Sequence, residues 1–135
     1  MHEIKVPAQI EALDGVLDFV ETAMNDAGAE MKYVPGISIA VEEIFVNIAH
    51  YAYPSGEGFV YISLQVSADQ LTMEFKDSGV PYDPLARKDP DTTLSVEDRE
   101  IGGLGIYMVK NMMDSVVYRY EDGFNILIIN KKFGE

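Results

Sequence analysis

Two neighbouring stretches place a large apolar residue at every second position: Val60-Tyr61-Ile62-Ser63-Leu64-Gln65-Val66 and Leu71-Thr72-Met73-Glu74-Phe75-Lys76. An alternation of this period predicts two strands that each bury one face. Ala68-Asp69 turns the chain between them. We therefore expect a β-hairpin with one face packed against a core.

Two helical patterns precede this hairpin. Apolar residues recur at helical spacing in residues 8–27, and Gly28 follows where a C-terminal cap would fall. A second helix is expected over residues 35–51, with a proline in its first turn. Before them, residues 3–6 alternate and end at a proline, which favours an edge strand.

The part after the hairpin begins with an aperiodic stretch, residues 78–101, which holds three prolines and six acidic residues. A loop of that length inside a compact domain is usually functional, often as a lid. A third helix is expected after Gly102-Gly103-Leu104-Gly105, to about Asp114. Two last strands, 116–121 and 124–133, meet at Asp122-Gly123, which is a strong hairpin signal.

The expected order of elements is β-α-α-β-β-lid-α-β-β. Strands that neighbour in hairpins, with helices grouped elsewhere, predict a two-layer α/β sandwich: a mixed, mostly antiparallel sheet with helices on one face. We expect residues 1–135 to form a single domain.

Composition excludes several classes of protein. With 10 basic and 23 acidic residues, the net charge of −13 argues against a nucleic-acid binder or a polybasic membrane anchor. The absence of cysteine and the presence of only two histidines exclude thiolate zinc sites and His-rich metal sites. No signal peptide or membrane-spanning stretch is visible, so we expect a cytoplasmic protein.

Glu43 and Asn47 are the first candidate site residues. They are four positions apart on the second expected helix, so they share one face that borders the buried side. A carboxylate and an amide oxygen are hard ligands suited to Mg²⁺. The carboxylate is also suited to act as a general base. A solvated polar stripe is the alternative.

Asp77 is the second candidate. It has the same parity as Met73 and Phe75, so it points with the apolar side chains and needs hydrogen-bond donors. Gly79, two residues later, would let a ligand approach the backbone closely. An inward carboxylate at a strand end suits recognition of an exocyclic amine such as that of adenine. An Asp that only caps a turn is the alternative.

The third candidate is the glycine-rich start of the helix after residue 101. Unpaired amides and the helix dipole make such a terminus suited to anions. The segment is not a Walker loop, because no Gly-Lys-Ser/Thr follows, and its spacing differs from the dinucleotide fingerprint. A hinge for the lid is the alternative.

Taken together, these motifs resemble the GHKL ATPase superfamily, which has the Bergerat fold, and within it the anti-sigma-factor serine/threonine kinases of the partner-switching type. The resemblance covers nearly the whole chain. It rests on segments 40–54 (AVEEIFVNIAHYAYP), 77–84 (DSGVPYDP) and 103–114 (GLGIYMVKNMMD). The Asp-x-Gly-x-Pro-aromatic-Asp-Pro variant is typical of the anti-sigma branch.

The resemblance implies a role for each motif. Glu43 would be the general base, and Asn47 the Mg²⁺ ligand. Asp77 would contact the adenine amine of ATP or ADP, and Gly79 would let the base approach. The residues implied at the phosphates, as a lid at about 82–102 closes, are Gly103, Leu104, Gly105 and, more weakly, Arg99.

The resemblance also implies a function and partners. The protein would transfer the γ-phosphoryl of ATP to a serine or threonine of a STAS-type anti-anti-sigma protein and would sequester a sigma factor or similar regulator, as a homodimer. A non-catalytic, ATP-gated binding module is the alternative from another class. A detached histidine-kinase catalytic domain is disfavoured, because the 135 residues hold no helical phosphoacceptor hairpin.

Three positions depart from the superfamily pattern. Pro81 stands where many members have a second glycine, although proline is usual in the anti-sigma branch. Asn125 falls near the position where many members have a threonine in a late strand, so an adenine contact there is open. Arg99 lies three residues before Gly102 rather than next to the lid glycines. The length of the lid leaves its closing geometry open too.

Overall fold

The computed structural model describes residues 1–54, 57–86 and 103–134. Its strands and α-helices follow in the order β1 (His2–Pro7), α1 (Leu13–Asp26), α2 (Val34–Tyr51), β2 (Phe59–Val66), β3 (Gln70–Asp77), α3 (Gly103–Met112), β4 (Ser115–Glu121) and β5 (Phe124–Lys132). Short 3₁₀ turns lie at Ile10–Ala12, Met31–Tyr33 and Pro84–Ala86.

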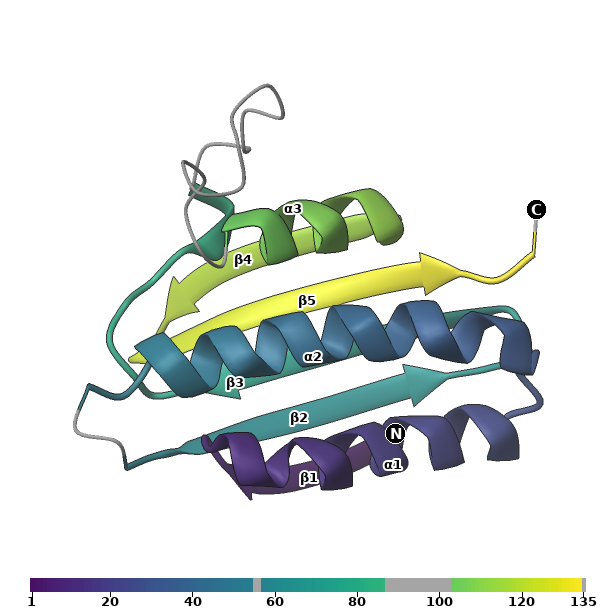
Figure 1. Ribbon diagram of the computed structural model, residues 1–135, viewed down its shortest axis with the longest axis horizontal. Helices are drawn as coiled ribbons and strands as arrows, with labels where there is room; N and C mark the ends of the chain where they lie inside the picture. The colour runs from purple at the N-terminus through teal and green to yellow at the C-terminus, as the bar shows by residue number, and fades with distance from the viewer. Residues whose placement is uncertain (55–56, 87–102, 135) are drawn as a thin grey trace.

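The strands form one sheet in the order β1-β2-β3-β5-β4. Every strand pairing within the described part of the chain is antiparallel, whereas we expected a mixed, mostly antiparallel sheet. The helices α1, α2 and α3 all cover the same face of the sheet (Figure 1). The two-layer α/β sandwich predicted from the sequence is confirmed.

The core lies between this sheet face and α2. The alternate residues of β3 predicted to face inward, Leu71, Met73 and Phe75, are each at most 1% exposed. They pack with α2, whose buried residues include Val41 and Phe45. Burying side chains of this size contributes about 1.5–3 kcal/mol each, so this contact contributes substantially to the stability of the fold.

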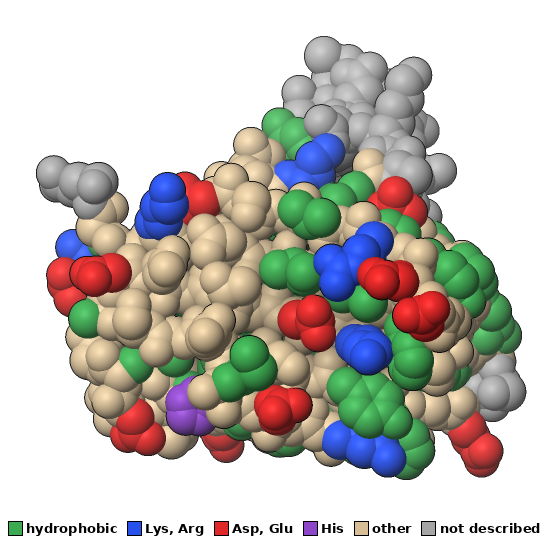
Figure 2. All heavy atoms as spheres, turned by 180° about the vertical axis from the view of Figure 1, so that it is seen from behind, with side chains coloured by type: hydrophobic (Ala, Val, Ile, Leu, Met, Phe, Trp, Pro, Cys, Tyr) green, Lys and Arg blue, Asp and Glu red, His purple; other side chains and the backbone are tan. Residues whose placement is uncertain are grey.

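The opposite sheet face carries no described helix, and charged and hydrophobic side chains mix there (Figure 2). Lys5 lies 4.3 Å from the ring centroid of Phe59, and Lys76 lies 4.3 Å from that of Phe124. These ammonium groups cover aromatic surface that would otherwise face water.

The ends of α1 show where local sequence does and does not set the structure. Gly28 has a φ of 80°, and the amides of Gly28 and Ala29 donate to the carbonyls of Asn25 (3.1 Å) and Met24 (3.0 Å), which is the Schellman cap predicted from the glycine. The start is different: α1 begins at Leu13 rather than at residue 8. The reason is a long-range hydrogen bond of 2.9 Å from the amide of Ala8 to Gly58, which keeps the chain extended.

The β4–β5 hairpin has the turn that its sequence predicts. Asp122 and Gly123 have φ values of 53° and 84°, the left-handed pair that a tight two-residue hairpin turn needs.

Within the described residues, no helix combines the length and the apolar character needed to cross a bilayer.

Candidate functional site

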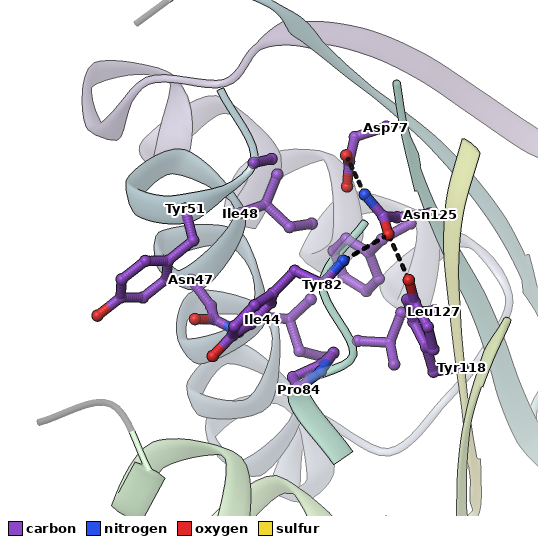
Figure 3. Close-up of a pocket in the computed structure, with 12 residues that line it drawn as sticks. Ile44, Asn47, Ile48, Tyr51, Asp77, Tyr82, Pro84, Tyr118, Asn125 and Leu127 are labelled. Atoms are coloured by element: carbon purple, nitrogen blue, oxygen red, sulfur yellow. Dashed lines mark hydrogen bonds between the residues drawn. The ribbon is translucent and has the colours of Figure 1, made fainter. Parts of the chain in front are cut away.

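A small cavity lies where the C-terminal half of α2, the end of β3 and the start of β5 meet (Figure 3). Its walls include Asn47 and Ile48 from α2, Asp77 from β3, Tyr118 from β4, Asn125 from β5 and Tyr82. Two of the three sequence motifs therefore contribute to one cavity, since Asn47 and Asp77 line it from opposite sides.

Asp77 is the buried carboxylate of this cavity. Its position in β3 points it inward, and only 3% of its surface is exposed. Its Oδ1 accepts hydrogen bonds from the amide of Gly79 (2.9 Å) and from Nδ2 of Asn125 (3.0 Å). Burial raises the pKa of Asp77, whereas these two hydrogen bonds lower it and only partly offset the effect of burial.

Asn125 stands directly opposite Asp77 in the β3–β5 register and is 6% exposed. Its Nδ2 donates to Asp77 and to the carbonyl of Val80 (2.8 Å). Its Oδ1 accepts from the amide of Tyr82 (3.1 Å) and from the hydroxyl of Tyr118. One amide thus ties β3, β4 and residues 80–82 together, as the dashed lines of Figure 3 show in part.

Gly79 fixes the turn after Asp77 against the end of α2. A Cβ added at Gly79 would lie 2.2 Å from the carbonyl oxygen of Ala52. The amide of Val80 donates to the same oxygen at 2.8 Å. No side chain fits at position 79 without moving backbone, so the glycine predicted for close approach is required by the fold itself.

Tyr82 packs beside the cavity and narrows it. Its ring stacks on Tyr51 at 5.5 Å between centroids and an interplanar angle of 23°, and its hydroxyl is buried. The remaining space is about 30 Å³, which suits one water molecule. A purine ring is larger than this space, so its entry would require lining side chains to move, and Tyr82 is one of them.

Glu43 makes the second half of the candidate site, one turn before Asn47 on α2. A Cβ added at Gly105 would lie 2.1 Å from Oε2 of Glu43 and 2.8 Å from its Cδ. The carboxylate is therefore in contact with the first turn of α3, where the helix dipole favours negative charge. The helix α2 thus connects the cavity, through Asn47, to the start of α3, through Glu43.

The donor set suits a nucleotide and, in part, a divalent metal. Asp77 Oδ2 accepts no hydrogen bond from the described residues and is open to an amine donor. Asn47 is half-buried in the cavity wall and offers an amide oxygen, a hard ligand of the kind Mg²⁺ takes together with water and phosphate oxygens. The described residues contain no cluster of three or more Asp, Glu or His side chains suited to a metal.

The other predicted positions fall at the limits of the described chain. Gly103 and Leu104 belong to the first turn of α3, as expected for a glycine-rich helix start. Arg99 and residues 87–102 of the expected lid lie outside the described residues. Asp83 and Pro84, at the start of that expected lid, are described, and Oδ1 of Asp83 accepts a hydrogen bond of 2.8 Å from the amide of Leu85.

The sequence did not identify Tyr82 and Tyr118 as residues of the site, nor did it predict that Asn125 makes four hydrogen bonds there. Asn125 had a signal in the sequence, because it shares the inward parity of Leu127 and Ile129, the same logic that identified Asp77. Tyr118 lies opposite Leu127, so its place follows only once the β4–β5 register is known.

Comparison with solved structures supports the fold. The crystal structure of the RsbU and RsbW domains of a Mycobacterium tuberculosis protein aligns with a TM-score of 0.65 at 12% identity, over 97% of this chain and 32% of that one. At this identity the likeness concerns the fold alone.

Two curated proteins, both serine-protein kinases RsbW, are similar to nearly the whole chain. A serine-protein kinase RsbW of Bacillus cereus is 28% identical over 130 residues, which is 93% of this chain and 81% of that protein. The serine-protein kinase RsbW of Bacillus thuringiensis subsp. konkukian is similar to the same extent, 28% over 130 residues.

A family model described as "Histidine kinase-like ATPase domain" matches residues 6–131. This range includes β2, β3 and β4, all of β5 but its last residue, the glycine-rich start of α3 and every residue that lines the cavity, whereas most of β1 lies before it. The chain therefore belongs to the family of histidine kinase-like ATPase domains.

Proposed function

We propose that this protein is an ATP-dependent protein serine/threonine kinase that acts as an anti-sigma factor. The observation that carries the proposal is that α2 contributes to two places at once. Its Asn47 lines the same cavity as the Asp77 carboxylate, and its Glu43 contacts Gly105 at the start of α3. Similarity to proteins named serine-protein kinase supports the choice of a hydroxyl acceptor.

Asp77 is the residue that recognises the base in this proposal. Its open oxygen, Oδ2, accepts a hydrogen bond from the exocyclic amine of adenine, and Gly79 remains the predicted point at which the ring approaches the backbone. The phosphates are placed near the start of α3, where Gly103, Leu104 and Gly105 present backbone amides. Arg99 remains a predicted contact of the γ-phosphate.

Glu43 is the residue that handles the proton. Its Oε2 accepts the proton of the attacking serine or threonine hydroxyl, a role that asks only for a half-buried carboxylate near the phosphate site. Asn47 holds Mg²⁺ through its side-chain oxygen. When bound, the metal neutralises charge on the phosphates.

The proposed partners follow from the resemblance and from the charge. A STAS-type anti-anti-sigma protein is the phosphoacceptor, and a sigma factor or similar regulator is the protein that is sequestered in the cytoplasm by a homodimer. A net charge of −13 favours basic protein surfaces over nucleic acid as partners.

The experiment incubates the purified chain with Mg²⁺ and γ-labelled ATP and, in turn, with each STAS-domain protein of the source organism. One acceptor should become labelled on a hydroxyl. Glu43→Gln should abolish labelling yet keep ADP binding, whereas Glu42→Gln, the exposed neighbour on α2, should label at the wild-type rate. If the chain binds no adenine nucleotide, the proposal is wrong.

A non-catalytic, ATP-gated binding module is the second candidate, and the small size of the cavity favours it. Because Tyr82 must move for a base to enter, nucleotide binding would rearrange the surface around residues 81–84. In the labelling experiment, this candidate predicts ATP binding, ATP-dependent capture of a partner and no labelled acceptor.

A further inference from the structure

The two oxygens of the Asp77 carboxylate differ in their surroundings. Oδ1 accepts two hydrogen bonds, from the backbone amide of Gly79 and from Nδ2 of Asn125, so both of its lone pairs are used. Oδ2 accepts none from the described residues. The carboxylate therefore offers the cavity a single acceptor atom rather than two.

Asn125 holds this arrangement because its amide has only one workable orientation. Nδ2 faces two acceptors, Oδ1 of Asp77 and the carbonyl of Val80. Its Oδ1 faces two donors, the amide of Tyr82 and the hydroxyl of Tyr118. Rotating the amide by 180° would oppose acceptor to acceptor at Asp77 and Val80 and donor to donor at Tyr82, and only the Tyr118 hydroxyl could adapt by accepting instead. At a buried site each such mismatch is costly.

A single acceptor distinguishes the two purine bases. Adenine presents one exocyclic amine as a donor beside a ring nitrogen that accepts. Guanine presents two adjacent donors, its ring N–H and its exocyclic amine, which match both oxygens of an open carboxylate in a bidentate pair. A carboxylate with one saturated oxygen loses that bidentate option and keeps the contact to adenine.

We propose that Asn125 is a positioning residue that sets base selectivity, by saturating one oxygen of Asp77 so that the cavity accepts adenine and rejects guanine. This inference rests on the proposed nucleotide-binding function, which it deepens. Asn125 acts through Asp77. Its loss therefore changes the preference between bases more than the ability to bind one.

The experiment measures dissociation constants for ADP and for GDP, each with Mg²⁺, by calorimetry. The wild-type chain should prefer ADP by about a hundredfold or more. Asn125→Leu keeps the branched shape of the side chain but removes the donor. It should reduce the ratio of the GDP dissociation constant to the ADP dissociation constant at least about tenfold. Asn125→Thr, whose hydroxyl can still donate to Asp77, should restore most of the ratio.

Asn130→Leu is the matched control. Asn130 lies in the same strand, is half-buried and donates to Thr72 (2.8 Å) and to the carbonyl of Leu71 (3.3 Å), away from the cavity. Its loss should leave the ratio unchanged even if the sheet is weakened. A loss of stability alone therefore does not reproduce the effect.

Tyr118→Phe keeps the test decisive if Asn125→Leu does not fold. It deletes the hydroxyl that donates to Asn125, and it should lower the ratio several-fold, whereas Tyr120→Phe, the exposed tyrosine of the same strand, should not. A folded Asn125→Leu or Tyr118→Phe with the wild-type ratio overturns this inference and leaves the proposed function standing. A wild-type chain that binds neither nucleotide overturns both.

Discussion

The contact between Glu43 and Gly105 makes the position of the proposed base sensitive to a single methyl group. In Gly105→Ala the new Cβ would lie 2.1 Å from Oε2 of Glu43, whereas non-bonded heavy atoms need roughly 3.5 Å. The carboxylate must therefore withdraw by more than about 1 Å. Because it is the far end of a flexible side chain, it moves at little cost to folding.

The magnitude follows from this displacement. A misplacement of about 1 Å in a reacting group costs roughly a hundredfold in rate, or about 2.7 kcal/mol of transition-state stabilisation. The same substitution replaces a helical glycine by alanine, which stabilises a helix by about 0.5–1 kcal/mol. Gly105→Ala should therefore lower the rate of phosphoryl transfer about a hundredfold without loss of thermal stability.

Single-turnover transfer from γ-labelled ATP to the cognate STAS-domain acceptor measures the rate, and a thermal melt measures stability. Gly15→Ala is the matched control, because a Cβ there meets nothing within 4 Å and α1 does not line the cavity. Wild-type transfer by Gly105→Ala would refute a catalytic position for Glu43. So would a rate loss that merely parallels a fall in melting temperature.

Three further changes test the cavity. Asp77→Asn keeps an oxygen for Gly79 and Asn125 but turns an amine toward adenine, so ADP affinity should fall about 10- to 100-fold in calorimetry. Burial raises the pKa of Asp77 above its ordinary value of 3.8, so the free energy of unfolding of the wild-type protein falls as pH rises through the raised pKa. Asp77→Asn has no carboxyl group at this position and should lack this fall. Thermal melts at pH 4 and pH 8 should therefore show that the stability of the variant relative to the wild type increases with pH. Gly79→Ala should destabilise the fold by about 1–3 kcal/mol in urea, because its Cβ meets backbone at 2.2 Å; wild-type stability contradicts that geometry. Tyr82→Ala should tighten ADP binding about 2- to 10-fold, the worth of one stacked aromatic pair, and weaker binding would mean that the ring instead supports the base.

The sequence predicted those features that depend on neighbouring residues. Alternation gave β2 and β3, and the parity of β3 placed Asp77 inward among apolar side chains. The cap at Gly28 follows from the freedom of glycine to adopt positive φ.

Features that depend on distant pairing were out of reach. The late start of α1 depends on the bond from Ala8 to Gly58, fifty residues along the chain. The sequence marked Asn125 only as a departure from the superfamily pattern. Its hydrogen bond to Asp77 could not be predicted, because the β3–β5 register determines which residues stand opposite each other. The packing of Tyr82 on Tyr51 likewise requires α2 and residues 81–84 to be placed in space before the rings can be seen to meet.

The bond between Asp77 and Asn125 joins residues 48 positions apart in the chain, and this has a consequence for folding. Contacts of large sequence separation form slowly, because the intervening loop must first be closed. A nascent chain that has emerged only as far as α3 already contains Glu43, Asn47 and Asp77 but lacks the strand that orients the carboxylate. Nucleotide should therefore bind only the finished sheet and stabilise it by mass action, so that a rise in melting temperature with ADP reports the completed β3–β5 pairing.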